Sequence, residues 1–205
     1  VACAYEYDKK VFVYDPVAGG AALVVIDVGS RVYALAVFKD PATGEQRLAC
    51  GCGDRKVRIF DPVAGGEALL VLDIGSEVWA LAVFTDKTGA QRLACGSEDR
   101  DRKVHVFDPV VGGEALVVLE VGAGVSALEV FKDPATGAPR LVCAAEKKVL
   151  VVDPVAGGDA LLVSRGLLVV VMMGTRYWRD CECAGGLQGA SDERAGARVR
   201  HRETR

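Results

Sequence analysis

The chain repeats one long pattern, and this repetition limits the folds it can adopt more than any other feature. The segment "KKVFVYDPVAGGAALVVIDVGSRVYALAVF" at 9–38 returns with few changes at 54–84 and 102–131, and a fourth copy begins with "KKVLVVDPVAGGDALLV". The period is 46, 47 and 45 residues, counted between the Asp-Pro pairs that begin at Asp15, Asp61, Asp108 and Asp153. A fixed period of this length is typical of solenoids, propellers and other repeat arrays.

One unit divides into four short segments with the patterns of β-strands. Residues 78–84 are apolar at nearly every position, as expected for a strand buried on both faces, and 92–97 follow after a turn. Residues 103–108 begin with alternating polar and apolar side chains, which indicates a half-covered strand. An Asp-Pro-Val-Val-Gly-Gly turn then leads into 114–121, because Pro fixes φ and Gly permits the positive φ of a reversal. Four strands in one period are typical of a β-propeller blade.

The segments "RLACGCGDRKVRIFDP" and "RLACGSEDRDRKVHVFDP" resemble the WD-repeat pattern. In that pattern a small-residue strand leads through an aspartate turn, here Asp54, Asp8 and Asp99, to a strand that ends in Trp-Asp. The closing dipeptides of this chain are Tyr14-Asp15, Phe60-Asp61, Phe107-Asp108 and Val152-Asp153. The resemblance covers residues 1 to about 165. It implies a propeller that binds peptides or partner proteins on one face, often within larger assemblies.

The chain departs from this family at the entry to the innermost strand of each blade. Where the family usually has Gly-His, the sequence has Asp27-Val28, Asp73-Ile74 and Glu120-Val121. Without this His and without the Trp, the family's buried hydrogen-bonded network cannot form as usual, so we expect aliphatic packing to hold the blades together. A kelch propeller is the alternative, but its Gly-Gly closes a strand, whereas Gly19-Gly20 lies inside a turn.

Counting strands predicts an all-β partial propeller of about four four-stranded antiparallel blades. Residues 1–28 supply three strands and lack the innermost one, and full blades follow at 32–74, 78–121 and 125–165. We expect the leucines of the innermost strands, Leu35, Leu81 and Leu128, to be buried. Residues 1–165 would form the blades, and 166–205 a strand-like run, Leu167–Met173, followed by a disordered tail rich in Arg and Gly.

Composition and charge bear on the partners and the compartment. The net charge is −3, which gives no global field toward nucleic acid or anionic membranes. The longest apolar run, 167–173, falls well short of the ~18 residues that cross a bilayer. There is no signal segment, so we expect an intracellular protein, cytoplasmic or nuclear. Because the first residue is Val, we also expect a piece of a longer propeller or of a larger assembly.

Cysteine usage agrees with an intracellular protein. Four of the seven cysteines stand in one column of the repeats, at Cys3, Cys50, Cys95 and Cys143. Side chains at equivalent positions of stacked units face the same way and are poor disulfide partners, so we expect small buried thiols.

Sequence variation between units is concentrated at one end of the strands. The link from the Cys column to the next strand has eight, seven, nine and six residues, whereas the Asp-Pro turns keep one length. Around the first Val of the innermost strands the residues also change from blade to blade. Because loops on a rigid scaffold usually carry specificity, we predict a surface for protein or peptide partners there. Its candidate residues are Arg31, Tyr33, Glu77, Trp79 and Ser126.

The sequence does not support catalysis, a cofactor or a metal site. His105 lies on the half-covered strand and His201 in the tail, so neither is placed as a general base, and no glycine-rich phosphate loop precedes a helix. Cys181, Cys183 and His201 fall short of a zinc ligand set. Two alternatives remain open. One is a ligand or metal site at the central channel, which the carboxylates of Asp27, Asp73 and Glu120 would have to form. The other is a truncated repeat-gene product without a function of its own.

Overall fold

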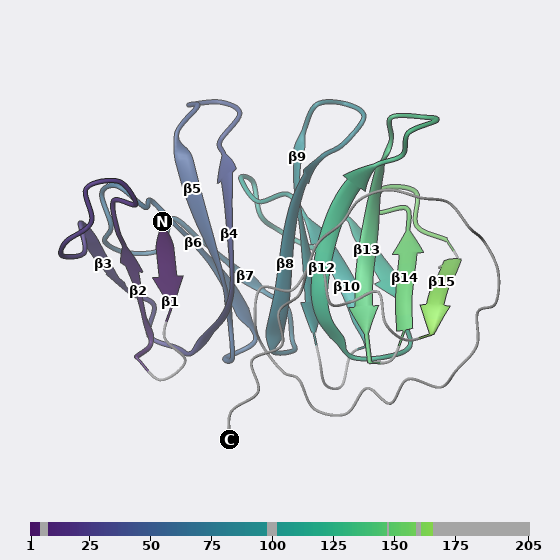
Figure 1. Ribbon diagram of the computed structural model, residues 1–205, viewed down its shortest axis with the longest axis horizontal. Coiled ribbons are helices and arrows are strands. Elements are labelled where there is room, and N and C mark those ends of the chain that lie inside the picture. The colour runs from purple at the N-terminus through teal and green to yellow at the C-terminus, as the bar shows by residue number, and fades with distance from the viewer. Residues whose placement is uncertain (5–7, 98–101, 147, 159–160, 166–205) are drawn as a thin grey trace, which may run out of the picture.

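The structure is a computed structural model that describes residues 1–4, 8–97, 102–146, 148–158 and 161–165. Every regular element in these ranges is a β-strand (Figure 1). The first sheet contains β1 (Ala2–Ala4), β2 (Lys10–Val13) and β3 (Val24–Asp27). The second contains β4 (Val32–Lys39), β5 (Gln46–Cys52), β6 (Lys56–Phe60) and β7 (Leu70–Asp73). The third contains β8 (Val78–Thr85), β9 (Gln91–Ser97), β10 (Lys103–Phe107) and β11 (Val117–Glu120). The fourth contains β12 (Val125–Lys132), β13 (Pro139–Ala145), β14 (Lys148–Val152) and β15 (Leu161–Arg165).

Each sheet is an antiparallel meander in which the strands lie in sequence order. Between sheets, β4 lies against β8 and β8 against β12, so these three are the innermost strands of their blades. Over the described ranges the first sheet has three strands, and its β1 is the strand that reaches β4. The predicted partial propeller with an incomplete first blade is therefore confirmed. The predicted strand-like run and tail, 166–205, lie outside the described residues.

Three aliphatic clusters fill the three interfaces between neighbouring blades. Ile26 of the first blade packs in one cluster with Leu48 and Phe60 of the second. The next interface joins residues such as Ile59 and Leu72 to Leu93 and Phe107, and the last joins Val106 and Leu119 to Leu141 and Val152. Burying one such side chain contributes about 1.5–3 kcal/mol. The aliphatic blade packing expected from the sequence is present.

The leucines of the innermost strands are buried to different degrees. Leu128 is buried as predicted, whereas Leu35 and Leu81 are half-buried and pack at the edge of their clusters. On the same side of β4, Val37 is 55% exposed, although its counterparts Val83 and Val130 are half-buried. Val83 and Val130 pack against the innermost strand of the preceding blade, and the described residues include no such strand in the first blade.

The arc has two faces, which we name by the turns they carry. The variable face holds the turns between the innermost strand of one blade and the blade before it, and those between the second and third strands, such as 28–31 and 53–55. The constant face holds the Asp-Pro turns and the turns that follow the innermost strands, such as 40–45. In Figure 1 the constant face is uppermost, with the β4–β5, β8–β9 and β12–β13 turns at the top. All five candidate residues lie at the variable face, two in turns and three near the start of innermost strands.

Candidate functional site

A β-bulge recurs at the same point in all three innermost strands, and it involves three of the candidate residues. Val32 pairs with Cys52, but the next pair is Ala34 with Gly51, so Tyr33 is the extra residue. The same skip occurs at Trp79 between Val78 and Ala80, and at Ser126 between Val125 and Ala127. Bulges twist a strand locally and re-aim a side chain, and they are common beside functional sites. The sequence signal was the variable second position of the Val-x-Ala-Leu pattern, which does not by itself reveal a bulge.

The bulges bring Tyr33 and Trp79 together although 46 residues separate them in the chain. Their rings are parallel, with centroids 4.4 Å apart and planes inclined by 11°. Tyr33 also rests against the β5–β6 turn, since a Cβ added at Gly53 would lie 3.0 Å from Tyr33 Cε2. Stacked aromatic pairs of this kind contribute about 0.5–1.5 kcal/mol beyond burial of their area. The second and third blades therefore share a rigid aromatic platform at the variable face.

A shallow pocket of about 390 Å³ lies next to this platform. Arg31, Tyr33 and Glu77 all line it, so the structure brings three of the five candidate residues into one concavity. The remaining lining comes from the neighbouring turns, namely Lys9, Gly29, Ser30, Gly53 and Asp54. Trp79 reaches this site through its stacking on Tyr33.

Two polar atoms of the bulge residues, Trp79 Nε1 and Ser126 Oγ, differ in their hydrogen bonding. Trp79 Nε1 is shielded from solvent and has no hydrogen-bond acceptor within the described part of the chain, so its N–H is an unused donor. Ser126 is exposed, and its Oγ donates a 3.2 Å hydrogen bond to the carbonyl of Ala144. Because Ser126 carries no ring, the aromatic platform does not continue into the fourth blade. Ser126 is the candidate residue that the structure does not bring to the pocket.

Asp54, in the β5–β6 turn, has a defined partner. Arg58 donates two hydrogen bonds to Asp54, at 2.9 and 2.5 Å. These bonds from Arg58 hold the pKa of Asp54 below its ordinary value. The pair closes the β5–β6 turn at the edge of the pocket, and Arg58 balances the charge of Asp54.

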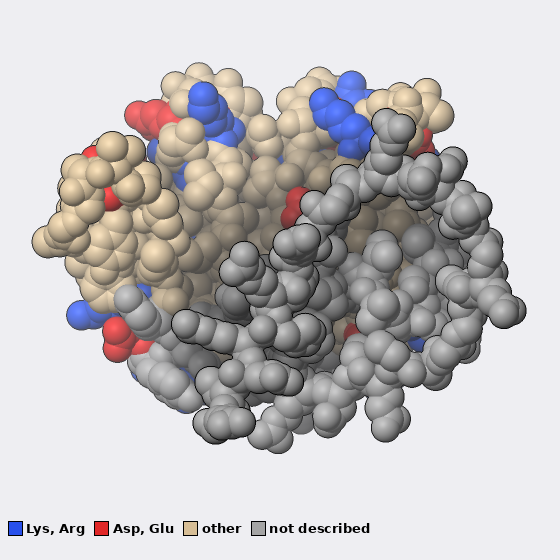
Figure 2. Space-filling model, in the orientation of Figure 1, with Lys and Arg blue, Asp and Glu red and all other residues tan. Residues whose placement is uncertain are grey.

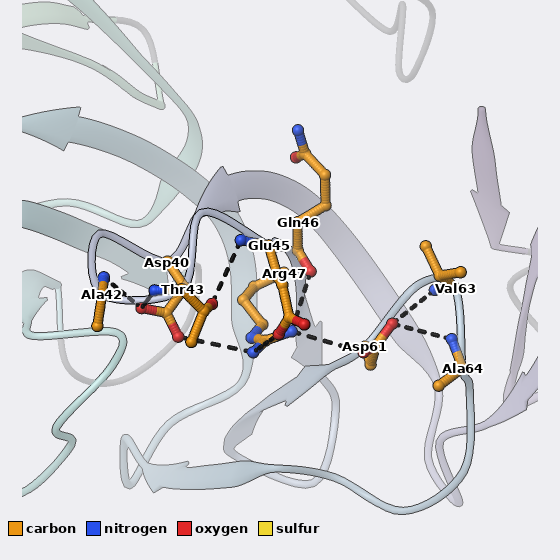
Figure 3. Close-up of polar contacts among 9 residues, drawn as sticks. All are labelled: Asp40, Ala42, Thr43, Glu45, Gln46, Arg47, Asp61, Val63 and Ala64. Atoms are coloured by element: carbon orange, nitrogen blue, oxygen red, sulfur yellow. Dashed lines mark hydrogen bonds and ion pairs between the residues drawn. The ribbon is translucent and has the colours of Figure 1, made fainter.

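The constant face carries a polar network that the sequence analysis did not find. Arg47 lies between two aspartates, 3.6 Å from Asp40 and 3.5 Å from Asp61 (Figure 3). The next two blades repeat the arrangement with Asp86–Arg92–Asp108 and Asp133–Arg140–Asp153. Along this upper edge, Figure 2 shows basic and acidic side chains side by side. The signal was present in the repeats, since an Arg precedes each small-residue strand and Asp recurs in both turns.

Backbone hydrogen bonds, more than Arg47, fix these carboxylates. Asp61 accepts hydrogen bonds from the backbone N–H groups of Val63 at 2.8 Å and Ala64 at 2.9 Å. The bond from Ala64 is the largest cause that lowers the pKa of Asp61, and Arg47 adds a smaller effect. The pKa of Asp40 is likewise lowered, first by the N–H of Ala42. The network therefore stabilises turns, and it shows no feature of a ligand site.

The column of carboxylates that the channel alternative requires lies elsewhere. Asp27, Asp73 and Glu120 end the outermost strands β3, β7 and β11, away from the innermost strands. Asp27 and Asp73 accept 3.0 Å hydrogen bonds from the backbone of Gly29 and Gly75. Glu120 lies 3.0 Å from Lys103. No group of His, Cys, Asp or Glu side chains in the described ranges could hold a metal ion, and these acids cannot form a channel site.

The cysteine column behaves as predicted in three of the four positions. Cys50, Cys95 and Cys143 are free and buried, each opposite the leucine of its innermost strand. Burial raises the pKa of the Cys95 thiol and raises that of Cys143 to about 12. Cys3 is free but exposed, because none of the strands that the structure describes covers it in the first blade. Cys181 and Cys183 lie outside the described residues.

Comparison with known proteins supports the fold. No protein-family model and no curated protein sequence matches the chain. Among solved structures, it is similar to BBS1N in complex with ARL6DN, in a crystal soaked with lead, at 17% identity and a TM-score of 0.57. That match covers 74% of this chain and 43% of BBS1N. A crystal of the same complex soaked with mercury matches at 17% identity and a TM-score of 0.58, and covers 80% of this chain and 47% of BBS1N. The chain thus spans less than half of these structures, and it has the fold of part of a β-propeller.

The described residues were also compared with what a membrane-spanning helix requires. No helix among them is long and apolar enough to cross a bilayer.

Proposed function

We propose that this chain is a non-catalytic protein-interaction scaffold of the WD-repeat type, acting inside the cell through the variable face of its propeller arc. The partner-binding residues would be Arg31, Tyr33, Glu77, Trp79 and Ser126. A protein or peptide partner would lie on the platform formed by the two stacked rings.

One observation carries the proposal. The same bulge recurs in three blades, yet its side chain is Tyr33, Trp79 or Ser126, so an unvarying backbone device presents a different side chain each time. Large rings anchored at a surface are the residue types that most often dominate the energy of protein interfaces. The similar BBS1N structures are complexes with another protein, ARL6DN, which agrees with a binding role.

The test compares two surfaces of the same protein. One variant carries Arg31→Ala, Tyr33→Ala, Glu77→Ala and Trp79→Ala, and the control carries Ala42→Glu and Ala64→Glu in turns of the constant face. Each protein is immobilised, partners from cell extract are identified by mass spectrometry, and the strongest is purified for calorimetric titration. We expect the first variant to lose binding and the control to keep it.

Circular dichroism separates loss of the surface from loss of the fold. Both variants should keep the β-sheet spectrum of the unchanged protein, since three of the four substituted side chains lie in or beside the pocket and not in the aliphatic clusters. Equal loss of binding by both variants would contradict a one-face scaffold. A purified partner that binds the first variant with unchanged affinity would do the same.

A further inference from the structure

One basic side chain in each of the first three blades stands at the same turn of the variable face. Lys9, Arg55 and Arg102 come directly before β2, β6 and β10, and all three are exposed. Their φ angles of 51°, 68° and 51° lie in the left-handed region. This conformation is uncommon for residues other than glycine, so its recurrence shows that one turn geometry places the three cations equivalently. In the fourth blade the residue with a left-handed φ, 52°, is Glu146, two positions before β14.

The cations next in sequence stand opposite acids of the neighbouring strand. Lys10 pairs in register with Asp27 and Lys56 with Asp73, and Lys103 forms a 3.0 Å ion pair with Glu120. By contrast, no ion pair or side-chain hydrogen bond joins Lys9, Arg55 or Arg102 to any residue the structure describes. The acid beside Arg55 is bound by Arg58, so it does not neutralise Arg55. Lys9, Arg55 and Arg102 stand in the turns before β2, β6 and β10, so no described strand places an acid opposite them in register.

The pocket joins this arc of cations at its first blade. Lys9 lines the pocket together with Arg31 and Ser30. Of the two acids in the lining, Asp54 is balanced by Arg58, which leaves Glu77. Lys9 is therefore a cation of the pocket lining as well as the first member of the arc.

We infer that the variable face binds an acidic, extended peptide segment of the partner, whose carboxylates meet Lys9, Arg55 and Arg102. This inference rests on the proposed function, because it assigns a class of partner to the same face. Carboxylates suit an arc of separate cations, and complementary charge would set register and speed association. Single-stranded nucleic acid fits less well, because it binds by stacking bases on aromatic faces. The ring of Tyr33 is already stacked on Trp79 and rests on Gly53.

The probe is a fluorescein-labelled peptide of alternating Glu and Ser, with a Lys-Ser peptide and a labelled single-stranded oligonucleotide of equal length for comparison. Fluorescence anisotropy measures binding at low salt. The test variant is Lys9→Glu, Arg55→Glu and Arg102→Glu. The matched control is Lys39→Glu, Lys87→Glu and Lys132→Glu, three exposed lysines of the constant face that change the net charge equally.

We expect the acidic peptide to bind the unchanged protein, with the test variant at least about tenfold weaker and the control within about twofold. The affinity should fall as salt rises. Absence of binding, equal weakening in both variants, or tighter binding of the oligonucleotide would each overturn the inference. The scaffold proposal is judged separately by the purified partner, so a protein that keeps its partner but ignores the acidic peptide refutes only the acidic ligand.

Discussion

Replacing Gly96 with alanine tests how tightly neighbouring blades pack. Gly96 in β9 faces the start of β12 in the next blade, and an added Cβ would lie 2.7 Å from Val125 Cγ1 and 3.3 Å from Leu128 Cδ1. Carbon atoms prefer separations of about 3.5–4.0 Å, so the new methyl overlaps Val125 by roughly 1 Å. Overpacking of this kind costs about 1–3 kcal/mol, and removing a glycine from a strand returns about 0.5–1 kcal/mol. We expect Gly96→Ala to lower the free energy of unfolding by about 1–2 kcal/mol.

A second substitution separates this clash from other causes. Val125 is fully buried, so Val125→Ala alone should cost about 1.5–3 kcal/mol through lost burial. It also removes the Cγ1 atom against which the new methyl presses. The double variant should therefore be more stable than the sum of the two single effects predicts, by about 1 kcal/mol. Urea denaturation followed by circular dichroism measures all three proteins. Additive effects, or a neutral Gly96→Ala, would refute the packing argument.

Three further predictions follow from the described residues. Arg92→Met should cost about 1–3 kcal/mol in urea denaturation and more than Arg140→Met, because the Arg92 side chain is 19% exposed and that of Arg140 30%. Backbone N–H groups lower the pKa of Asp61 and Asp133 in the folded state, so their stabilisation is complete above the unfolded pKa of about 3.9 and is lost as pH falls through the folded pKa. Acid denaturation should show this loss below about pH 4, and stability that stays constant there would contradict it. Among the described cysteines, a maleimide should label Cys3 first under native conditions, as peptide mapping would show, and early labelling of a buried cysteine would contradict the structure.

Much of the fold was predictable because the repeat compares the chain with itself. The period and the four strand-like segments in each unit placed blades at 32–74, 78–121 and 125–165, and the sheets run over 32–73, 78–120 and 125–165. The absence of an innermost strand in the first blade was also evident, since residues 1–28 contain no Val-x-Ala-Leu segment. Hydrophobic periodicity reports burial directly, which is why these inferences succeeded.

The candidate site was predictable only in part. Variation between units pointed to Tyr33 and Trp79, but local pattern cannot show that a register skip places both rings in one stack. The network around Arg47 was missed because its two aspartates, Asp40 and Asp61, are far apart in sequence and meet only across two turns. Pairing of this kind depends on where turns meet in space.

By itself, then, the sequence determined the class of fold, the number of blades and the face on which they differ, since each depends on local periodicity and turn chemistry. Tertiary structure decided which side chains meet. Cys3 and Val37 are exposed beside the three described strands of the first blade, whereas Cys50 and Cys95, the counterparts of Cys3, are buried. Four nearly identical units thus acquire different surfaces, because the burial of a side chain depends on the neighbouring blade as well as on its own sequence.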